Sequence, residues 1–121
     1  MRPTRQNFYK RGDVVLAYFP NSDQTRTKAR PVLIVEADNL QTGIAQVIVV
    51  TITGQMRRAG HPSRVTVRKD SPEGRAAGLF ADSVVMTDSI ATIEEEAIDY
   101  AIGSLSMLAV EAALRPTFGL D

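Results

Sequence analysis

The chain has 121 residues, of which 44% are hydrophobic and 23% charged, a composition typical of one folded globular domain with its own core. It contains no cysteine and one histidine, which excludes a disulfide framework, a thiolate nucleophile and a cysteine–histidine metal centre. There is no apolar run of about 18 residues and no apolar signal-peptide centre in "MRPTRQNFYKRGD", so we expect a cytoplasmic protein without a membrane segment. The expected domain is 1–121, with 1–9 as an N-terminal extension.

The formal net charge is zero, but the charges are unevenly distributed. Residues 1–69 hold 12 Lys and Arg against 4 Asp and Glu, whereas residues 70–121 hold 2 against 10. The basic part is suited to a polyanion such as a nucleic acid. Alternatively, the two parts attract each other, or the acidic residues line a solvated helix. The distribution alone leaves both interpretations open.

Short segments rich in β-branched and aromatic residues, separated by polar loops, predict strands through most of the chain. The run "AQVIVVTIT" is apolar throughout, which indicates a strand covered on both faces. The segment "RVTVRK" instead alternates apolar and polar residues. Strands are expected at 13–19, 30–37, 45–53, 64–69, 83–88 and 89–93, with polar loops at 20–29 and 54–63 and a turn at 70–78. Several short strands of this kind predict a small barrel or sandwich.

The last third changes to a period of three to four residues, which predicts helical structure between 92 and 115. Thr92 fits an N-cap, and Glu95 stands at the capping-box spacing. Gly103 is expected to divide this region into two segments, the second beginning at 104 or 106. Pro116 is expected to end it. The fold class is therefore mainly β with a C-terminal helix.

Three polar residues stand at the ends of expected strands: Arg30, Thr53 and Asp88. A guanidinium fork binds a phosphate through two hydrogen bonds, and a hydroxyl adds a third. A carboxylate can accept the proton of a ribose 2′-hydroxyl. If the strand ends converge, these groups suffice to cleave RNA by attack of its own 2′-oxygen, without a metal or cofactor. The same residue types are also common in ordinary strands and turns, so a purely structural role stays open.

Other kinds of site find little support. The sequence has no Gly-x-Ser-x-Gly elbow, and "EGRAAG" lacks the lysine and serine of a phosphate-binding loop. His61 lies in a loop, where a lone histidine is more often a surface residue than a base. The run Glu94–Glu96 is explained as the solvated start of a helix. Neither a metal site nor a bound cofactor is predicted.

The order of the segments is similar to that of the MazF/PemK family of toxin ribonucleases. The similarity rests on "RGDV" at 11–14, "RPVL" at 30–33 and "TIT" at 51–53, together with "KRGDVVLAYFP", "ARPVLIVEAD", "VIVVTITGQ" and "DSVVMTDSIATIE". It extends from about residue 10 to residue 114. Each motif is weak alone, and the ordered set is specific.

This resemblance implies an SH3-like β-barrel with a C-terminal helix, a homodimer, and a toxin of a type II toxin–antitoxin pair. It implies metal-independent, sequence-specific cleavage of single-stranded RNA to a 2′,3′-cyclic phosphate and a 5′-hydroxyl. Arg30 and Thr53 match the family's catalytic arginine and threonine, and Asp88 matches an acidic residue proposed as general base. Some members carry an arginine where this chain has Met86, and many carry one where it has Ala91.

The loop 20–29 matches a family loop that covers RNA and responds to the antitoxin. We expect RNA contacts from residues on the two polar loops, namely Pro20, Lys28, Gln55, Arg57 and Arg58. The partners implied are single-stranded RNA, a cognate antitoxin, a second copy of the chain and operator DNA bound together with the antitoxin.

Two other functions remain alternatives. One is a non-catalytic SH3-like module that binds a peptide or an antitoxin tail, because a fold does not fix a function. The other is a DNA-binding autoregulator that uses the basic first part of the chain. Dimerisation would cover apolar faces of the strand 64–69 and the helical segment 104–115, although the barrel itself could also cover them.

Overall fold

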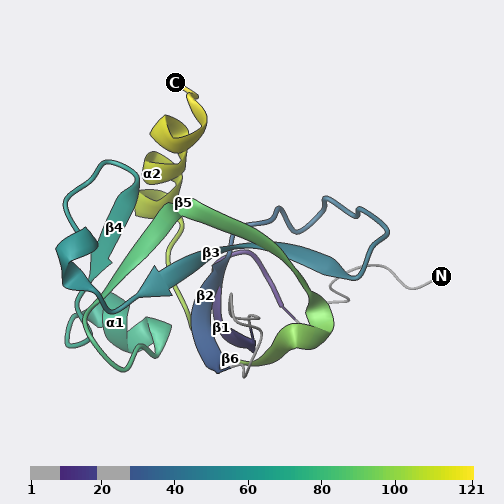
Figure 1. The fold of residues 1–121 in the computed structure, drawn as a ribbon, viewed down its shortest axis with the longest axis horizontal. Helices are drawn as coiled ribbons and strands as arrows, with labels where there is room; N and C mark the ends of the chain where they lie inside the picture. The colour runs from purple at the N-terminus through teal and green to yellow at the C-terminus, as the bar shows by residue number, and fades with distance from the viewer. Residues whose placement is uncertain (1–8, 19–27) are drawn as a thin grey trace.

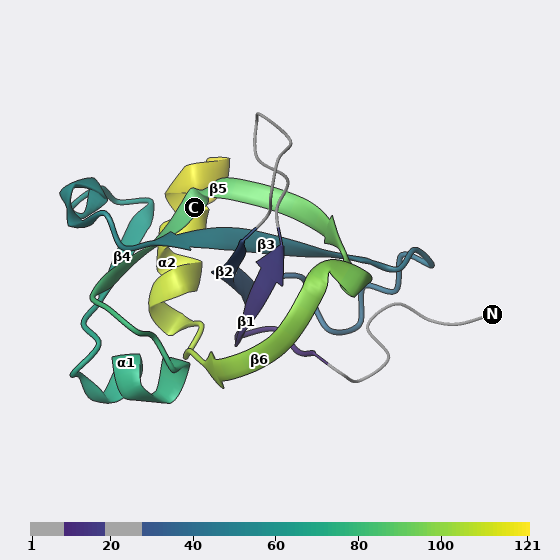
Figure 2. The ribbon, with the colours of Figure 1, turned by 60° about the horizontal axis from the view of Figure 1, so that its bottom comes forward.

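The computed structural model describes residues 9–18 and 28–121, so Phe19 and the loop residue Pro20 lie outside the described part. Its strands and helices follow one another along the chain as shown in Figures 1 and 2. The elements are β1 (Asp13–Tyr18), β2 (Ala29–Ile34), β3 (Gln46–Thr53), the 3₁₀ turn η1 (Met56–Arg58), β4 (Arg64–Val67), α1 (Pro72–Ala77), β5 (Ser83–Glu94), the 3₁₀ turn η2 (Glu95–Ala97), β6 (Ile98–Ser104) and α2 (Leu108–Phe118).

The six strands form one antiparallel sheet in the order β4-β5-β3-β2-β1-β6. Figure 1 shows β5, β3, β2, β1 and β6 curling around a common centre, with β4 and both helices to one side. Within the described residues, the outer strands β4 and β6 do not pair with each other, so the sheet does not close into a complete barrel. The predicted mainly β fold with a C-terminal helix is confirmed.

Two apolar clusters lie on opposite faces of the sheet. The first contains Leu33, Val50, Val85 and Val110 and is covered by α1, α2 and β4. The second lies inside the curl and contains members from five strands, namely Val15, Ala17, Val32, Ile34, Val47, Val49, Ile93 and Ile98. Strand β3 contributes to both clusters, which confirms the prediction that both of its faces are covered. Each fully buried aliphatic side chain stabilises the fold by about 1.5–3 kcal/mol.

The predicted helix beginning at Thr92 is wrong. Thr92 lies in β5 opposite Ile48, and Ile98 begins β6 opposite Ala17. Glu94 does not start an α-helix: it ends β5 just before the short 3₁₀ turn η2, and it accepts a hydrogen bond from the Gln46 side-chain amide across the sheet at 2.9 Å. The apolar spacing and the three glutamates favour a helix locally, but pairing with β3 and β1 lets the same residues cover the second cluster. Tertiary context therefore overrides local propensity.

The expected roles of Gly103 and Pro116 are also wrong. Gly103 does not divide a helix but lies in β6, where α1 packs so closely that an added Cβ would lie 2.3 Å from the Ala76 carbonyl oxygen. Pro116 lies inside α2, which ends at Phe118 with Gly119 in the left-handed conformation. The predicted second helical segment is confirmed as α2. None of the helices in the described residues is long and apolar enough to cross a membrane.

A bulge in β5 shapes the region around Asp88. The two strands predicted at 83–88 and 89–93 are a single strand, and its register with β3 changes from Val50–Ile90 to Thr51–Met86. Residues 87–89 are the extra residues on β5. A bulge of this kind bends a strand and redirects its side chains. Asp88 therefore stands out from the sheet, and its neighbour Thr87 is completely buried.

Candidate active site

Arg30 and Thr53 lie at one end of the β2–β3 ladder. Its last paired residues are Val32 and Thr51, and Arg30 and Thr53 each lie two residues beyond that pair. Continuing the register aligns them, and because side chains alternate along a strand they share the face of Val32. The guanidinium and the hydroxyl that the sequence assigns to one phosphate therefore lie on neighbouring strands and on the same side of the sheet.

The hydroxyl of Thr53 has a defined orientation. Its Oγ1 accepts a hydrogen bond from the Gln55 amide at 3.1 Å. A hydroxyl can donate one hydrogen bond and accept two. Since the backbone amide uses an acceptor position, the hydroxyl proton stays available to donate to a ligand oxygen.

The expected RNA-contacting residues that the structure describes lie close to this pair along the chain. Lys28 directly precedes β2 and is exposed, and Arg57 and Arg58 are exposed on η1. Gln55 caps η1, and its side-chain oxygen accepts from Nε of Arg58 at 3.4 Å. Pro20 and most of the loop 20–29 lie outside the described residues.

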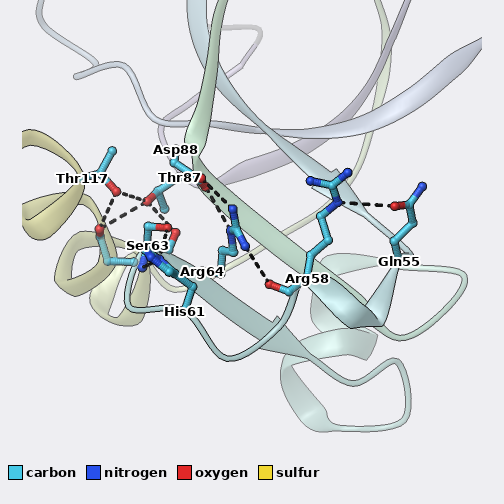
Figure 3. Close-up of polar contacts among 9 residues, drawn as sticks. Gln55, Arg58, His61, Ser63, Arg64, Thr87, Asp88 and Thr117 are labelled. Carbon is cyan, nitrogen blue, oxygen red and sulfur yellow. Dashed lines mark hydrogen bonds and ion pairs between the residues drawn. The ribbon is translucent and has the colours of Figure 1, made fainter.

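Asp88 is held by Arg64 of β4, as Figure 3 shows. Nη2 of Arg64 lies 2.8 Å from Oδ2 of Asp88, and Nε lies 3.3 Å from Oδ1, so the guanidinium binds both carboxylate oxygens. The side chains are 20% and 35% exposed, respectively. Arg64 is the cross-strand partner of Met86, two residues before Asp88.

This contact changes the acidity of Asp88. The hydrogen bonds from Arg64 lower the pKa of the Asp88 carboxyl, and its own backbone amide and the attraction of Arg64 lower it further. Partial burial opposes these contributions and is outweighed. The carboxylate is therefore ionised at neutral pH and can accept a proton, although a lower pKa also makes it a weaker base.

A buried group of hydrogen bonds supports the ion pair. Thr87, which is 0% exposed, donates from its amide to the Ser63 carbonyl at 3.1 Å, and its Oγ1 lies 2.7 Å from the same oxygen. The Thr87 hydroxyl also lies 2.7 Å from the Thr117 hydroxyl of α2. Since Ser63 precedes Arg64 and Thr87 precedes Asp88, this group fixes the backbone on both sides of the ion pair (Figure 3).

His61 has a structural role in the same loop. Its Nδ1 accepts from the Ser63 amide at 3.1 Å and lies 2.8 Å from the Ser63 hydroxyl. The contacts shape the turn that leads into β4. They agree with the sequence interpretation, which did not assign His61 as a base.

The ion pairs explain part of the uneven charge distribution. Three pairs join described residues, and each joins a cation of the first part to an anion of the second: Arg11–Glu111, Arg64–Asp88 and Arg68–Asp82. The two parts therefore attract each other. Within residues 9–18 and 28–121, however, Lys28, Arg30, Arg57 and Arg58 form no ion pair. The attraction between the two parts is therefore confirmed, and the suitability of the remaining cations for a polyanion stays a prediction.

The structure brings Arg30 and Thr53 together and places Asp88 further away. Thr53 pairs with Val84, and Asp88 lies four residues further along β5. Because residues 87–89 are the extra residues of the bulge, only the two residues from Val84 to Met86 follow a regular strand rise, which is about 7 Å along the strand.

Arg64 is absent from the residues that the sequence predicts for this site. The alternation in 64–69 places it on a polar face, but nothing in the sequence identifies the strand that pairs with β4. Among the described residues, no three His, Asp or Glu side chains are grouped closely enough to hold a metal together.

A model of PemK-like, MazF-like toxins of type II toxin–antitoxin systems matches residues 10–118. The chain belongs to the PemK/MazF toxin family. The match covers nearly all of the chain and confirms the resemblance inferred from its motifs. The structure also gives two residues of "RGDV" at 11–14 a role in the fold. Gly12 has a φ of +97°, which favours glycine, and Nη2 of Arg11 bonds Glu111 of α2 at 3.0 Å.

Solved toxins of this family share the fold. The Mycobacterium tuberculosis toxin MazF-mt6 is 29% identical, with a TM-score of 0.70, over 90% of this chain and 98% of that one. A mycobacterial endoribonuclease in complex with its cognate antitoxin is 22% identical, with a TM-score of 0.69, over 93% and 97%. MazF of a MazE–MazF structure from Deinococcus radiodurans is 18% identical, with a TM-score of 0.66, over 94% and 98%.

Proposed function

We propose that the protein is an endoribonuclease that cleaves single-stranded RNA at a short sequence, without a metal. The alignment of Arg30 with Thr53 at the open end of the β2–β3 ladder carries this proposal. Membership of a toxin family with structurally similar endoribonucleases supports it.

In the proposed reaction the RNA supplies its own nucleophile. The 2′-oxygen attacks the neighbouring phosphorus, a new P–O2′ bond forms, and the P–O5′ bond breaks. The products are a 2′,3′-cyclic phosphate and a 5′-hydroxyl. Negative charge grows on the phosphate oxygens as the 2′-oxygen approaches, and the enzyme accelerates the reaction by stabilising this charge.

Arg30 and Thr53 bind the scissile phosphate. Arg30 directs a guanidinium fork at two of its oxygens, and Thr53 donates its hydroxyl proton to one of them. Pro31 restricts the backbone of Arg30 to extended geometry, so the fork is held on a stiff strand. Groups fixed before the substrate binds need little reorganisation during the reaction.

Asp88 accepts the proton of the 2′-hydroxyl. Because the attacking 2′-oxygen lies directly beside the scissile phosphorus, this role requires the phosphate bound by Arg30 to lie within a few ångströms of the Asp88 carboxylate, on the side of the bulge. Arg30 does not supply a proton to the leaving 5′-oxygen, because a guanidinium keeps its proton up to a pH of about 12 or higher. Met86 carries no proton to donate, so water protonates the leaving oxygen.

The implied partners follow from the family and from the surface. A cognate antitoxin with an acidic segment would inhibit by occupying the cationic surface around Lys28, Arg30 and Arg57. We also propose a homodimer, since a groove of about 450 Å³ lies between β4 and α2 and Leu108 on its rim is 80% exposed. The place of action is the bacterial cytoplasm, where the RNA is.

Incubation with a long single-stranded RNA in EDTA tests the proposal. Cleavage at a few sites that is lost in Thr53→Ala is expected, and mass spectrometry should find cyclic phosphate ends. RNA that stays intact would contradict the proposal and favour the non-catalytic binding module. Binding of duplex DNA that weakens steeply with salt would instead favour the autoregulator.

A further inference from the structure

Arg64 is the one described side chain that bonds both Asp88 and the loop carrying the expected RNA-contacting residues. Its Nε and Nη2 atoms bind the Asp88 carboxylate at 3.3 and 2.8 Å. Its Nη1 atom donates to the Arg58 carbonyl oxygen at 3.2 Å. Figure 3 shows the guanidinium of Arg64 between Asp88 of β5 and the backbone of Arg58 in η1.

These bonds make Arg64 unlike the cations around Arg30. A guanidinium has five N–H donors in one plane, and all three nitrogens of Arg64 already donate to protein atoms. The charge of Arg64 is also neutralised by Asp88. Arg30 and Arg57, in contrast, form no ion pair within the described residues and are exposed. Arg64 therefore holds protein groups in place, and the binding of RNA phosphate falls to Arg30 and its neighbours.

The backbone that carries Arg64 is held in place by its neighbours. The two bonds from Thr87 to the Ser63 carbonyl lie directly beside the ion pair, and Thr87 is fully buried. Arg64 itself pairs with Met86 in the β4–β5 ladder. A side chain fixed by its backbone and bonded at three nitrogens has lost most of its rotamer freedom, so its partners are held without further entropy cost when RNA binds.

We propose that Arg64 is a positioning residue of the ribonuclease site, which fixes the Asp88 carboxylate and the η1 loop in one arrangement. This inference rests on the proposed function. Arg64 does not touch the RNA in this account. It orients the oxygen of Asp88 that receives the 2′-hydroxyl proton, and it holds the backbone from which Arg57 and Arg58 extend.

The acidity of Asp88 gives a readout that separates this role from a merely structural one. Among the described residues, Arg64 of β4 is the charged group that bonds Asp88, while Arg58 of η1 is joined to Arg64 through its carbonyl and the His61 ring bonds Ser63, whose hydroxyl also lowers the pKa of Asp88. Arg64 is the largest contributor to the lowered pKa of Asp88. Without it, the pKa of Asp88 rises, so Asp88 is protonated at a higher pH and the acid limb of the pH–rate profile moves upward.

The experiment compares two substitutions of Arg64 with a matched control. Arg64→Gln removes the charge and the fork. Arg64→Lys keeps the charge but cannot bind both Asp88 oxygens and the Arg58 carbonyl together. Arg68→Gln is the control, because Arg68 forms an ion pair of the same type with Asp82 at 3.2 Å, away from Asp88. Single-turnover RNA cleavage is measured against pH, and the Asp88 carboxyl is titrated by NMR.

Arg64→Gln is expected to slow cleavage by about 100-fold, the usual effect of a misplaced catalytic group, and to move the acid limb and the Asp88 titration to higher pH. Arg64→Lys keeps the attraction but loses the two-point hydrogen bonding, so its acid limb should lie between those of the parent and Arg64→Gln, and it should still cleave slowly. Arg68→Gln should match the parent in both measurements. An Arg64→Gln variant with the parent's rate and acid limb would overturn the proposal.

Different results would contradict the role of Arg64 and the proposed ribonuclease function. If the parent cleaves RNA and Arg64→Gln cleaves equally well, only the role of Arg64 is wrong. If the parent does not cleave RNA, the proposed function is wrong, and the positioning role falls with it. If Arg64→Gln is inactive but its Asp88 titration is unchanged, Arg64 does not act through Asp88 and the proposal is also overturned.

Discussion

Arg30 and Arg64 show how two arginines on one sheet can serve different ends. Arg30 stands at the end of β2, exposed and without an ion pair within the described residues. Arg64 stands on β4, with its guanidinium bonded to Asp88 and to the Arg58 carbonyl. A cation left unsatisfied by the fold is available to a ligand, whereas a satisfied one organises its neighbours. Positive charge in a sequence does not distinguish the two, and the strand pairing does.

The largest effect is expected from Asp88→Asn, at the carboxylate that Arg64 binds. The amide cannot accept the 2′-hydroxyl proton, so the cleavage rate should fall by about 10²–10⁴-fold. The acid limb of the pH–rate profile should disappear, because it reports the ionisation of this carboxyl. Pre-steady-state cleavage assays across the acidic range measure both. A variant with the parent's rate would show that Asp88 serves only the ion pair.

The next largest effect is expected from Arg30→Lys, which keeps the positive charge of the exposed arginine and loses its guanidinium fork. Cleavage should fall by about 10²–10³-fold, which is typical for the loss of one preorganised donor to the developing charge. The melting temperature should not change, because Arg30 bonds no described side chain. Arg57→Lys is the matched control on an exposed loop and should change cleavage far less. Equal losses in both variants would indicate general attraction of RNA rather than a specific fork.

The buried hydrogen bonds of Thr87 beside Asp88 can be removed without changing Arg30 or Arg64. Thr87→Val keeps the shape of the side chain and removes a buried hydroxyl that bonds the Ser63 carbonyl and the half-buried Thr117 hydroxyl. The free energy of unfolding should fall by about 1–3 kcal/mol. Thr66→Val, at an exposed position of β4, should change it by no more than about 0.5 kcal/mol. Urea denaturation compares the two, and equal effects would mean that the buried bonds add nothing.

The smallest effect is expected from Asp82, whose ion pair with Arg68 is an exposed counterpart of the Asp88–Arg64 pair. The Lys69 amide and then Arg68 lower the pKa of Asp82 in the folded protein. Its stabilising contribution is therefore complete above the unfolded pKa of about 3.9 and is lost as the pH falls through the lower folded value. Asp82→Asn should be slightly less stable than the parent at neutral pH, and the difference should vanish in acid. A difference that grows in acid would reverse the assigned sign.

The first four strands could be predicted from sequence, and the region of β5 and β6 was harder. Apolar runs locate β1, β2 and β3, and alternation locates β4. The segment from Thr92 to Ile102 fails because its apolar spacing fits both a helix and a strand, and only pairing with β3 and β1 decides. Local propensity contains no information about the edge that a segment will cover.

Within the site, Arg30 and Thr53 are recognisable because motifs in order along the chain identify them. Asp88 is recognisable in the same way, but its guanidinium partner is not. Arg64 lies 24 residues earlier in sequence and meets Asp88 only through the β4–β5 register and the bulge at 87–89. A contact that depends on a bulge cannot be inferred from alternation, since each extra residue reverses which face a side chain occupies.

The central claim is that Arg30 and Thr53 act on the same phosphate, and a double-mutant cycle tests it most directly. Single-turnover cleavage rates are measured for the parent, Arg30→Lys, Thr53→Ala and the double variant. Because groups that act as a unit are strongly non-additive, the double variant should be little slower than the slower single variant. Fully multiplicative losses would show that the two side chains act independently, and would contradict the account.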